Sequence, residues 1–184
     1  NPLGHNLAAQ LNYWRWIDHL VAAGVQRIEF VSNLAWTDRV PSPAGNDVAP
    51  IGREKMAEYA SYLMAKDTGS VVAFAPDNYW NQSPAEHWLP AWDTDIGRPL
   101  GQRAQVASGT DPVGQGYAIW RRAYTHAVIL MRTTSKTSTN YGDATSVSIP
   151  IGAIGRLLRS DGTTSPPDSI VQLRAGEGVV VLTP

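Results

Sequence analysis

The 184-residue chain contains no cysteine and only two phenylalanines, although it has seven tryptophans and seven tyrosines. The absence of cysteine excludes disulfide bonds and thiolate metal sites, but it leaves the localisation open, with an extracellular or cell-surface location allowed. The longest apolar runs, such as Ala127–Met131, are far shorter than the roughly 20 residues of a membrane-spanning helix. A formal net charge of −1 gives no electrostatic reason to expect nucleic acid or a membrane as a partner.

The first residues, Asn1–His5, also lack the features of a secretory leader. They contain no initiator Met, no basic segment and no apolar segment, so no signal peptide is visible. We therefore expect the chain to be part of a longer protein.

The N-terminal part of the sequence alternates between two hydrophobic periods. Apolar residues three and four apart predict helices over Asn6–Ala23 and around Met56–Lys66. Short β-branched and apolar runs predict strands over Val25–Ser32 and Ser70–Ala75, with a long loop over Asn33–Arg53 between them. The order helix, strand, helix, strand is typical of α/β folds and favours parallel pairing of the two strands.

The C-terminal part reads differently, because helical periodicity disappears from it. Pro76–Gly116 is rich in loop-forming residues and aromatic rings, and the hairpin connection Thr125-His126 follows it. Short strands separated by Gly, Asp and Pro turns predict an antiparallel β-sandwich. The predicted strands are Tyr117–Tyr124, Ala127–Thr133, Ser146–Ile151, Ala153–Arg159, Ser169–Arg174 and Val179–Leu182.

The change of period falls at the segment Trp92–Gly101. Glycine at position 97 suits a bend and Pro99 stiffens the chain after it. We expect Asp93 and Asp95 to orient this segment by hydrogen bonds rather than to perform chemistry. An ordinary Gly- and Pro-rich loop would show the same composition.

Five stretches carry a resemblance to a known group of proteins. They are the helix pattern of Met56–Lys66, an apolar strand ending near Tyr79-Trp80, the turn Asp95-Ile-Gly-Arg-Pro-Leu-Gly101, the run Tyr117–Arg132 and the closing segment Leu173–Leu182. Together they resemble the C-terminal region of bacterial glycoside hydrolases in which a (β/α)8 barrel precedes a small β-domain. The resemblance implies the last βα units of a TIM barrel over residues 1–92, a linker over 93–116 and a β-sandwich over 117–184. A small open α/β layer completed by the β-rich half is the alternative fold.

The same resemblance implies a function and partners. The protein would act on a polysaccharide or oligosaccharide, and an upstream segment or a second chain would complete the barrel. The alternatives are a non-catalytic carbohydrate-binding module and a structural or interaction module.

Candidate site residues follow from where barrel enzymes place their chemistry, at the carboxyl ends of the strands. Asp38 and Asp77 follow the two predicted strands and are the candidate catalytic acids, although a glycosidase needs a pair of carboxyl groups and each acid could instead be a solvated loop residue or a helix cap. Aromatic and basic side chains near them are candidates for substrate binding, with core filling as the alternative for the rings. These residues are Trp36, Arg39, Tyr79, Trp80 and Trp88.

No cofactor is expected. The four histidines have no metal-ligand spacing, and neither a dinucleotide fingerprint, a phosphate loop nor a nucleophile elbow is present. Arg121-Arg122 is too short for a basic patch, and in a strand its two side chains point to opposite faces.

Overall fold

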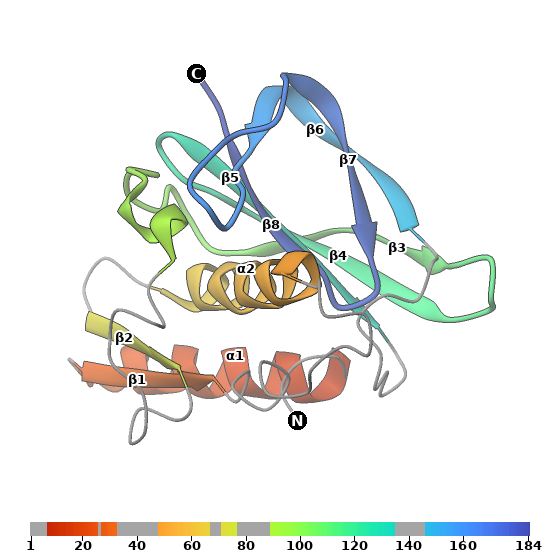
Figure 1. Cartoon of the computed structure of the whole chain (residues 1–184). Coiled ribbons are helices and arrows are strands. Elements are labelled where there is room, and N and C mark those ends of the chain that lie inside the picture. Colours follow the sequence, from red (N-terminus) through yellow and green to blue (C-terminus); the bar gives the residue numbers. More distant parts are fainter. Residues whose placement is uncertain (1–6, 26, 33–47, 67–70, 77–88, 135–145) are drawn as a thin grey trace.

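The computed structural model describes residues 7–25, 27–32, 48–66, 71–76, 89–134 and 146–184. Two helices and two short strands come first, and a 3-10 turn and six further strands follow (Figure 1). In chain order these elements are α1 (Leu7–Ala22), β1 (Arg27–Ser32), α2 (Val48–Ala65), β2 (Val71–Pro76), η2 (Pro90–Asp93), β3 (Ala104–Thr110), β4 (Gly116–Ala123), β5 (Ala127–Thr134), β6 (Ser146–Leu157), β7 (Asp168–Arg174) and β8 (Gly178–Leu182).

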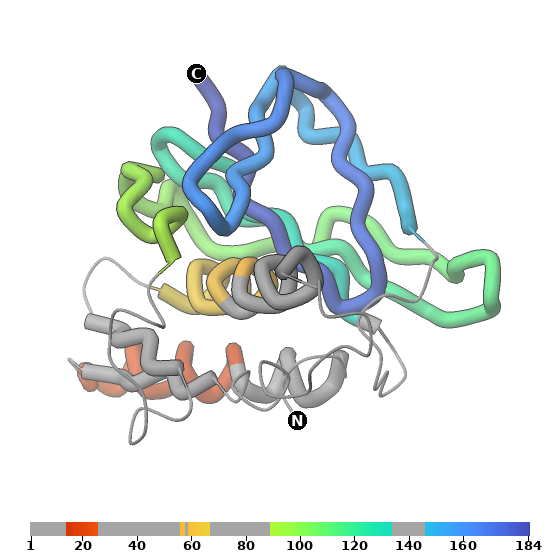
Figure 2. The backbone as a smooth tube through the Cα atoms, in the orientation of Figure 1, coloured from red at the N-terminus to blue at the C-terminus, as the bar shows by residue number. Residues whose placement is uncertain are grey.

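The six later strands form one antiparallel sheet in the order β3-β4-β5-β8-β6-β7. The predicted hairpin is confirmed as β4–β5, in which Ala123 pairs with Val128. The sheet curls, so that β6 and β7 bend over the other strands; Figure 2 follows the chain up through β6 and back down through β7. The antiparallel strands were predicted correctly, but they build one curled sheet rather than two stacked sheets.

Each face of the curled sheet covers its own hydrophobic core, because successive side chains of a strand point to opposite faces. One face packs against the helices and the other lies inside the curl. On β5, Ile129 and Met131 belong to the helix-side core and Val128 and Leu130 to the core inside the curl. A one-residue change of register would therefore exchange the two cores.

Helix α2 lies between the sheet and α1 (Figure 1). Its buried face includes Leu63 and Met64, and these pack with residues of β5 and β8 such as Val180. The backbone approach at Gly178 is very close, since a Cβ there would lie 2.6 Å from the Cβ of Ala60. Glycine is thus required at the start of β8 for α2 to reach the sheet.

Strands β1 and β2 pair in parallel, from Arg27 opposite Val71 to Ser32 opposite Pro76. This confirms the pairing that the helix–strand alternation predicts. Strands β1 and β2 are nevertheless only two of the eight strands among the described residues.

The predicted fold class, the end of a TIM barrel followed by a β-sandwich, is wrong. Most described strands are antiparallel and belong to a curled, half-barrel-like sheet, and the only helices of the described residues are α1, α2 and the turn η2. The apolar face of α2 covers this antiparallel sheet instead of the outside of a parallel barrel. Helical periodicity specifies that a helix buries one face, but not which kind of sheet it buries that face against.

Three predicted boundaries also change, each for a local reason. Helix α2 begins at Val48, inside the predicted loop, because Pro50 is tolerated in the first turn of a helix. Strand β3 was missed because every one of its residues is exposed, so it shows no alternation. The two strands predicted on either side of Gly152 are one strand, β6, which is irregular between Pro150 and Gly155.

The segment around Gly97 turns as predicted. The backbone N–H of Gly97 donates to Oδ1 of Asp95 at 2.8 Å, and Gly97 has a φ of 75°. The chain then runs beside the β4–β5 turn, where the N–H of Leu100 donates to the carbonyl of Ala123 at 2.9 Å. Asp95 therefore orients this segment by hydrogen bonding.

Candidate binding cleft

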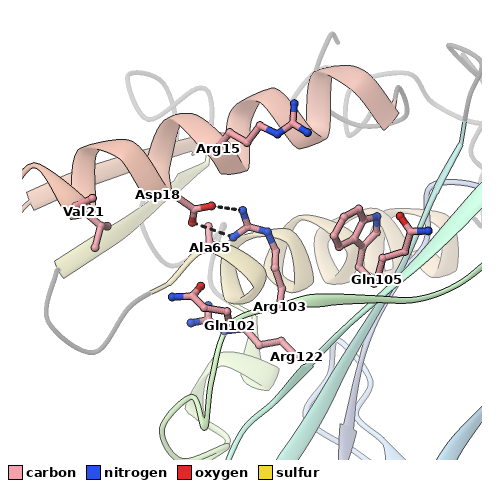
Figure 3. Close-up of a pocket in the computed structure, with 10 residues that line it drawn as sticks. Arg15, Asp18, Val21, Ala65, Gln102, Arg103, Gln105 and Arg122 are labelled. Carbon is pink, nitrogen blue, oxygen red and sulfur yellow. Dashed lines mark hydrogen bonds and ion pairs between the residues drawn. The ribbon is translucent and has the colours of Figure 1, made fainter.

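A cleft of about 660 Å³ lies between α1, the end of α2, the start of β3 and the second half of β4. Figure 3 shows side chains of α1 on one side of it and side chains from the β3 region on the other. The volume is within the range of small-molecule sites. Its lining residues are Arg15, Asp18, Val21, Ala22, Ala65, Gln102, Arg103, Gln105, Trp120 and Arg122.

Helix α1 contributes Arg15 and Asp18, which are three residues apart and therefore neighbours on the helix surface. Trp14 and Ile17, by contrast, are fully buried in the helix-side core. The amphipathic pattern that packs α1 thus places a guanidinium and a carboxylate side by side at the edge of the cleft.

Arg103 links the two sides of the cleft. Its Nη1 and Nη2 donate to Oδ1 and Oδ2 of Asp18 at 3.1 and 2.5 Å, a two-point pairing of guanidinium and carboxylate. Nη1 also donates to the Met64 carbonyl at 3.2 Å, and the guanidinium carbon lies 4.9 Å from the ring centroid of Trp14. The Arg103 side chain is only 10% exposed, whereas the Asp18 side chain that it pairs with is 47% exposed.

Arg122 fixes the floor of the cleft by binding the C-terminal end of α2. Its Nη1 donates to the carbonyls of Leu63, Met64 and Lys66 at 2.9, 3.0 and 2.5 Å. Its Nε donates to the Gly101 carbonyl at 2.9 Å. The last carbonyls of a helix have no N–H donor within the helix and carry partial negative charge, so a buried cation that donates to them is favourable.

Trp120 supplies the aromatic surface of the cleft. Its indole N–H donates to the Thr133 hydroxyl at 3.1 Å, and its ring meets that of Trp14 edge to face at 5.4 Å between centroids. The ring is half-buried. Both contacts fix its orientation, so the remaining exposed part of the ring is a preformed apolar surface.

A second polar cluster lies away from this cleft, at the end of the sheet inside the curl. Nη2 of Arg132 donates to Oδ2 of Asp111 at 2.7 Å, and neither side chain is exposed. The other oxygen, Oδ1, accepts the N–H groups of Gln115 and Val113 at 2.8 and 3.1 Å. Arg132 also lies 5.0 Å from the ring centroid of Tyr117.

This hydrogen bonding sets the ionisation of Asp111. Burial alone would raise the pKa of its carboxyl, but the N–H of Gln115, the guanidinium of Arg132 and the N–H of Val113 outweigh burial. The pKa therefore lies below its usual range, and the carboxylate is charged at neutral pH. We assign this cluster a structural role.

The candidate residues from the sequence are all outside the described residues. They are the predicted catalytic acids Asp38 and Asp77, and the predicted substrate-binding residues Trp36, Arg39, Tyr79, Trp80 and Trp88. Their roles stay predictions, as do the domain boundaries at 92 and 116. Within the described part, the helix-side core joins residues from both sides of these boundaries, such as Leu63 and Val180.

The residues of the cleft were not among the predicted site residues, although the sequence holds a signal for some of them. Trp120, Arg122 and Tyr124 alternate along β4, and this period of two places them on one face. That Arg121 and Arg122 point to opposite faces is confirmed, because Arg122 binds α2 and is 3% exposed, whereas Arg121 is more exposed. No comparable signal links α1 to Gln102, Arg103 or Gln105, which are more than 80 residues away.

The described residues contain neither a metal-binding cluster nor a membrane-spanning helix. No group of three His, Asp or Glu side chains there could hold a metal ion. No helix among these residues is long and apolar enough to span a membrane. Comparison with family models, curated proteins and solved structures also found no match to the chain.

Proposed function

We propose that this chain is a non-catalytic carbohydrate-binding module and that the cleft between α1 and β3 is its sugar site. The observation that carries the proposal is the combination of a fixed, half-buried Trp120 with the exposed amides of Gln102 and Gln105. A sugar ring presents an apolar face and a rim of hydroxyl groups. An aromatic ring suits the face, and amide groups both donate and accept hydrogen bonds at the rim.

The cleft supports binding better than hydrolysis. Glycoside hydrolysis needs two carboxyl groups on either side of the scissile bond. Asp18 is the one carboxylate among the lining residues, and both of its oxygens accept hydrogen bonds from Arg103. Hydrolysis of a polysaccharide stays a prediction, which depends on residues such as Asp38 and Asp77.

Calorimetric titration with a panel of neutral and acidic oligosaccharides tests the proposal. We expect saturable binding without release of reducing ends, and a loss of about tenfold in affinity in Gln102→Ala and Gln105→Ala, the equivalent of one hydrogen bond. Gln172→Ala is the matched control, because Gln172 is exposed on β7 and bonds to Ser148 instead. Absence of binding across the whole panel, or an equal effect of the Gln172 change, would refute the proposal.

A further inference from the structure

The charges around the cleft indicate what kind of sugar it would take. Three guanidinium groups line it, those of Arg15, Arg103 and Arg122, against the single carboxylate of Asp18. The chain as a whole has a net charge of −1. The excess of cations is therefore a local property of this cleft and not of the protein surface in general.

The carboxylate is already paired within the cleft, although the Asp18 side chain is 47% exposed. Both oxygens of Asp18 are bound by Arg103, whose guanidinium is further held by the Met64 carbonyl and the ring of Trp14. Two strong donors already occupy this carboxylate, which leaves it fewer positions at which to accept hydrogen bonds from sugar hydroxyl groups. Its negative charge is thus largely neutralised.

What the cleft presents to a ligand is then cationic. Arg15 is exposed on α1, one turn before Asp18, and comes from the side of the cleft opposite Gln102 and Gln105 (Figure 3). A guanidinium is planar and matches the two oxygens of a carboxylate or sulfate group. A ligand lying on Trp120 between the two sides would have the amides and this cation within one site.

We infer that the cleft binds a sugar bearing an anionic group, a uronate carboxylate or a sulfate ester, with Arg15 as the residue that selects the charge. This inference rests on the proposed function, because it takes the ligand to be a carbohydrate. It adds a substrate class and a selecting residue that lies outside the group contacting the neutral part of the sugar.

Matched pairs of acidic and neutral ligands separate the contribution of charge to the affinity from that of the sugar ring. The titrations use an oligogalacturonate and its methyl ester, and a sulfated galactan oligosaccharide and its desulfated form. We expect at least one acidic ligand to bind about tenfold or more tightly than its neutral counterpart, with the difference decreasing as salt screens the charges. The pair that shows the difference identifies carboxylate or sulfate as the recognised group.

Two variants complete the test. Arg15→Gln should abolish the preference for the acidic ligand, and Arg98→Gln, the same charge change at an exposed residue outside the cleft, should leave it intact. Equal affinity for both members of each pair, or a preference that survives in Arg15→Gln, would overturn the inference while neutral-sugar binding still upheld the proposed function. Absence of binding to every ligand of either kind would overturn both.

Discussion

Two arginines on neighbouring strands, each nearly or fully buried, are accommodated in different ways on the two faces of the sheet. Arg122 on β4 points to the helix side, where the described hydrogen bonds join it to backbone carbonyls at the end of α2 and to Gly101. Arg132 on β5 points inside the curl, where a buried carboxylate, Asp111, faces it at 2.7 Å. Burying either cation alone would be very costly.

The two arginines differ in whether their partners can change protonation state. Carbonyl dipoles do not titrate, so Arg122 keeps these partners at any pH at which α2 is formed. Asp111 can take up a proton, which would remove the negative charge that faces the buried Arg132 at 2.7 Å. Changes in packing and hydrogen bonding on the helix side should therefore lower the free energy of unfolding. Inside the curl, the free energy of unfolding should depend on charge.

The largest expected effect comes from removing the charge of Asp111. Asp111→Asn keeps the side-chain shape but removes the negative charge that faces Arg132, and breaking a buried ion pair in this way costs about 3–5 kcal/mol. Urea unfolding followed by circular dichroism measures the change. Asp161→Asn is the matched control, because it removes the same charge in an exposed turn where the carboxylate bonds to Thr163.

A double variant that removes both charges tests the same ion pair. Replacing both partners by apolar residues, Asp111→Ala with Arg132→Met, should recover much of the lost stability, since no buried charge remains. A loss below about 1 kcal/mol in Asp111→Asn, or a double variant as unstable as the single one, would show that the pair does not behave as a buried ion pair.

A smaller loss is expected when Arg122 is changed to Met. The Lys66 carbonyl would lose the donor described for it, while the carbonyls of Leu63 and Met64 would keep only the Tyr124 hydroxyl and Nη1 of Arg103. Leaving a buried acceptor unsatisfied costs about 1–3 kcal/mol. Arg122→Lys should fall between Arg122→Met and the unchanged chain, because it keeps the charge but loses the forked geometry that reaches several carbonyls. The same urea unfolding measures both variants. Equal stability of the Met and Lys variants would mean that charge at the helix end contributes nothing.

The contribution of the two faces to stability should differ in its dependence on pH. The pKa of Asp111 is lowered in the folded chain, so the folded state binds its proton less readily than the unfolded state, whose pKa is about 3.9. The stabilisation from this group is thus complete above the unfolded pKa and is lost as the pH falls through the folded pKa.

The measurement is urea unfolding at a series of pH values below 5. The unchanged chain and Arg122→Met should lose stability in parallel, whereas Asp111→Asn should lose less, because it lacks the group that titrates. If all three chains showed the same acid dependence, other carboxyl groups would be responsible and the contrast between the faces would not hold.

How far the sequence predicts this structure depends on which contacts an element makes. The hairpin β4–β5, the parallel pair β1–β2 and both helices were predictable, because each follows from a local period or a short turn. The partner of α2 was not, since its apolar stripe would fit a barrel as well as the curled sheet. The cleft was missed for the same reason: Asp18 and Arg103 meet only because α1 and the residues before β3 both approach the end of α2, where Arg103 also binds the Met64 carbonyl.

The smallest expected effect is at Tyr124, which shares the helix end with Arg122. Its hydroxyl donates to the Leu63 carbonyl at 2.7 Å, a carbonyl that Arg122 also binds. Because Arg122 still donates a hydrogen bond to this carbonyl, Tyr124→Phe should lower the free energy of unfolding by only about 0.5–1.5 kcal/mol, the net value of one hydrogen bond. In the Arg122→Met background the same change should cost more, since the carbonyl then loses both donors. A double-mutant cycle measures this coupling, and strictly additive losses would show that the two side chains support the end of α2 independently.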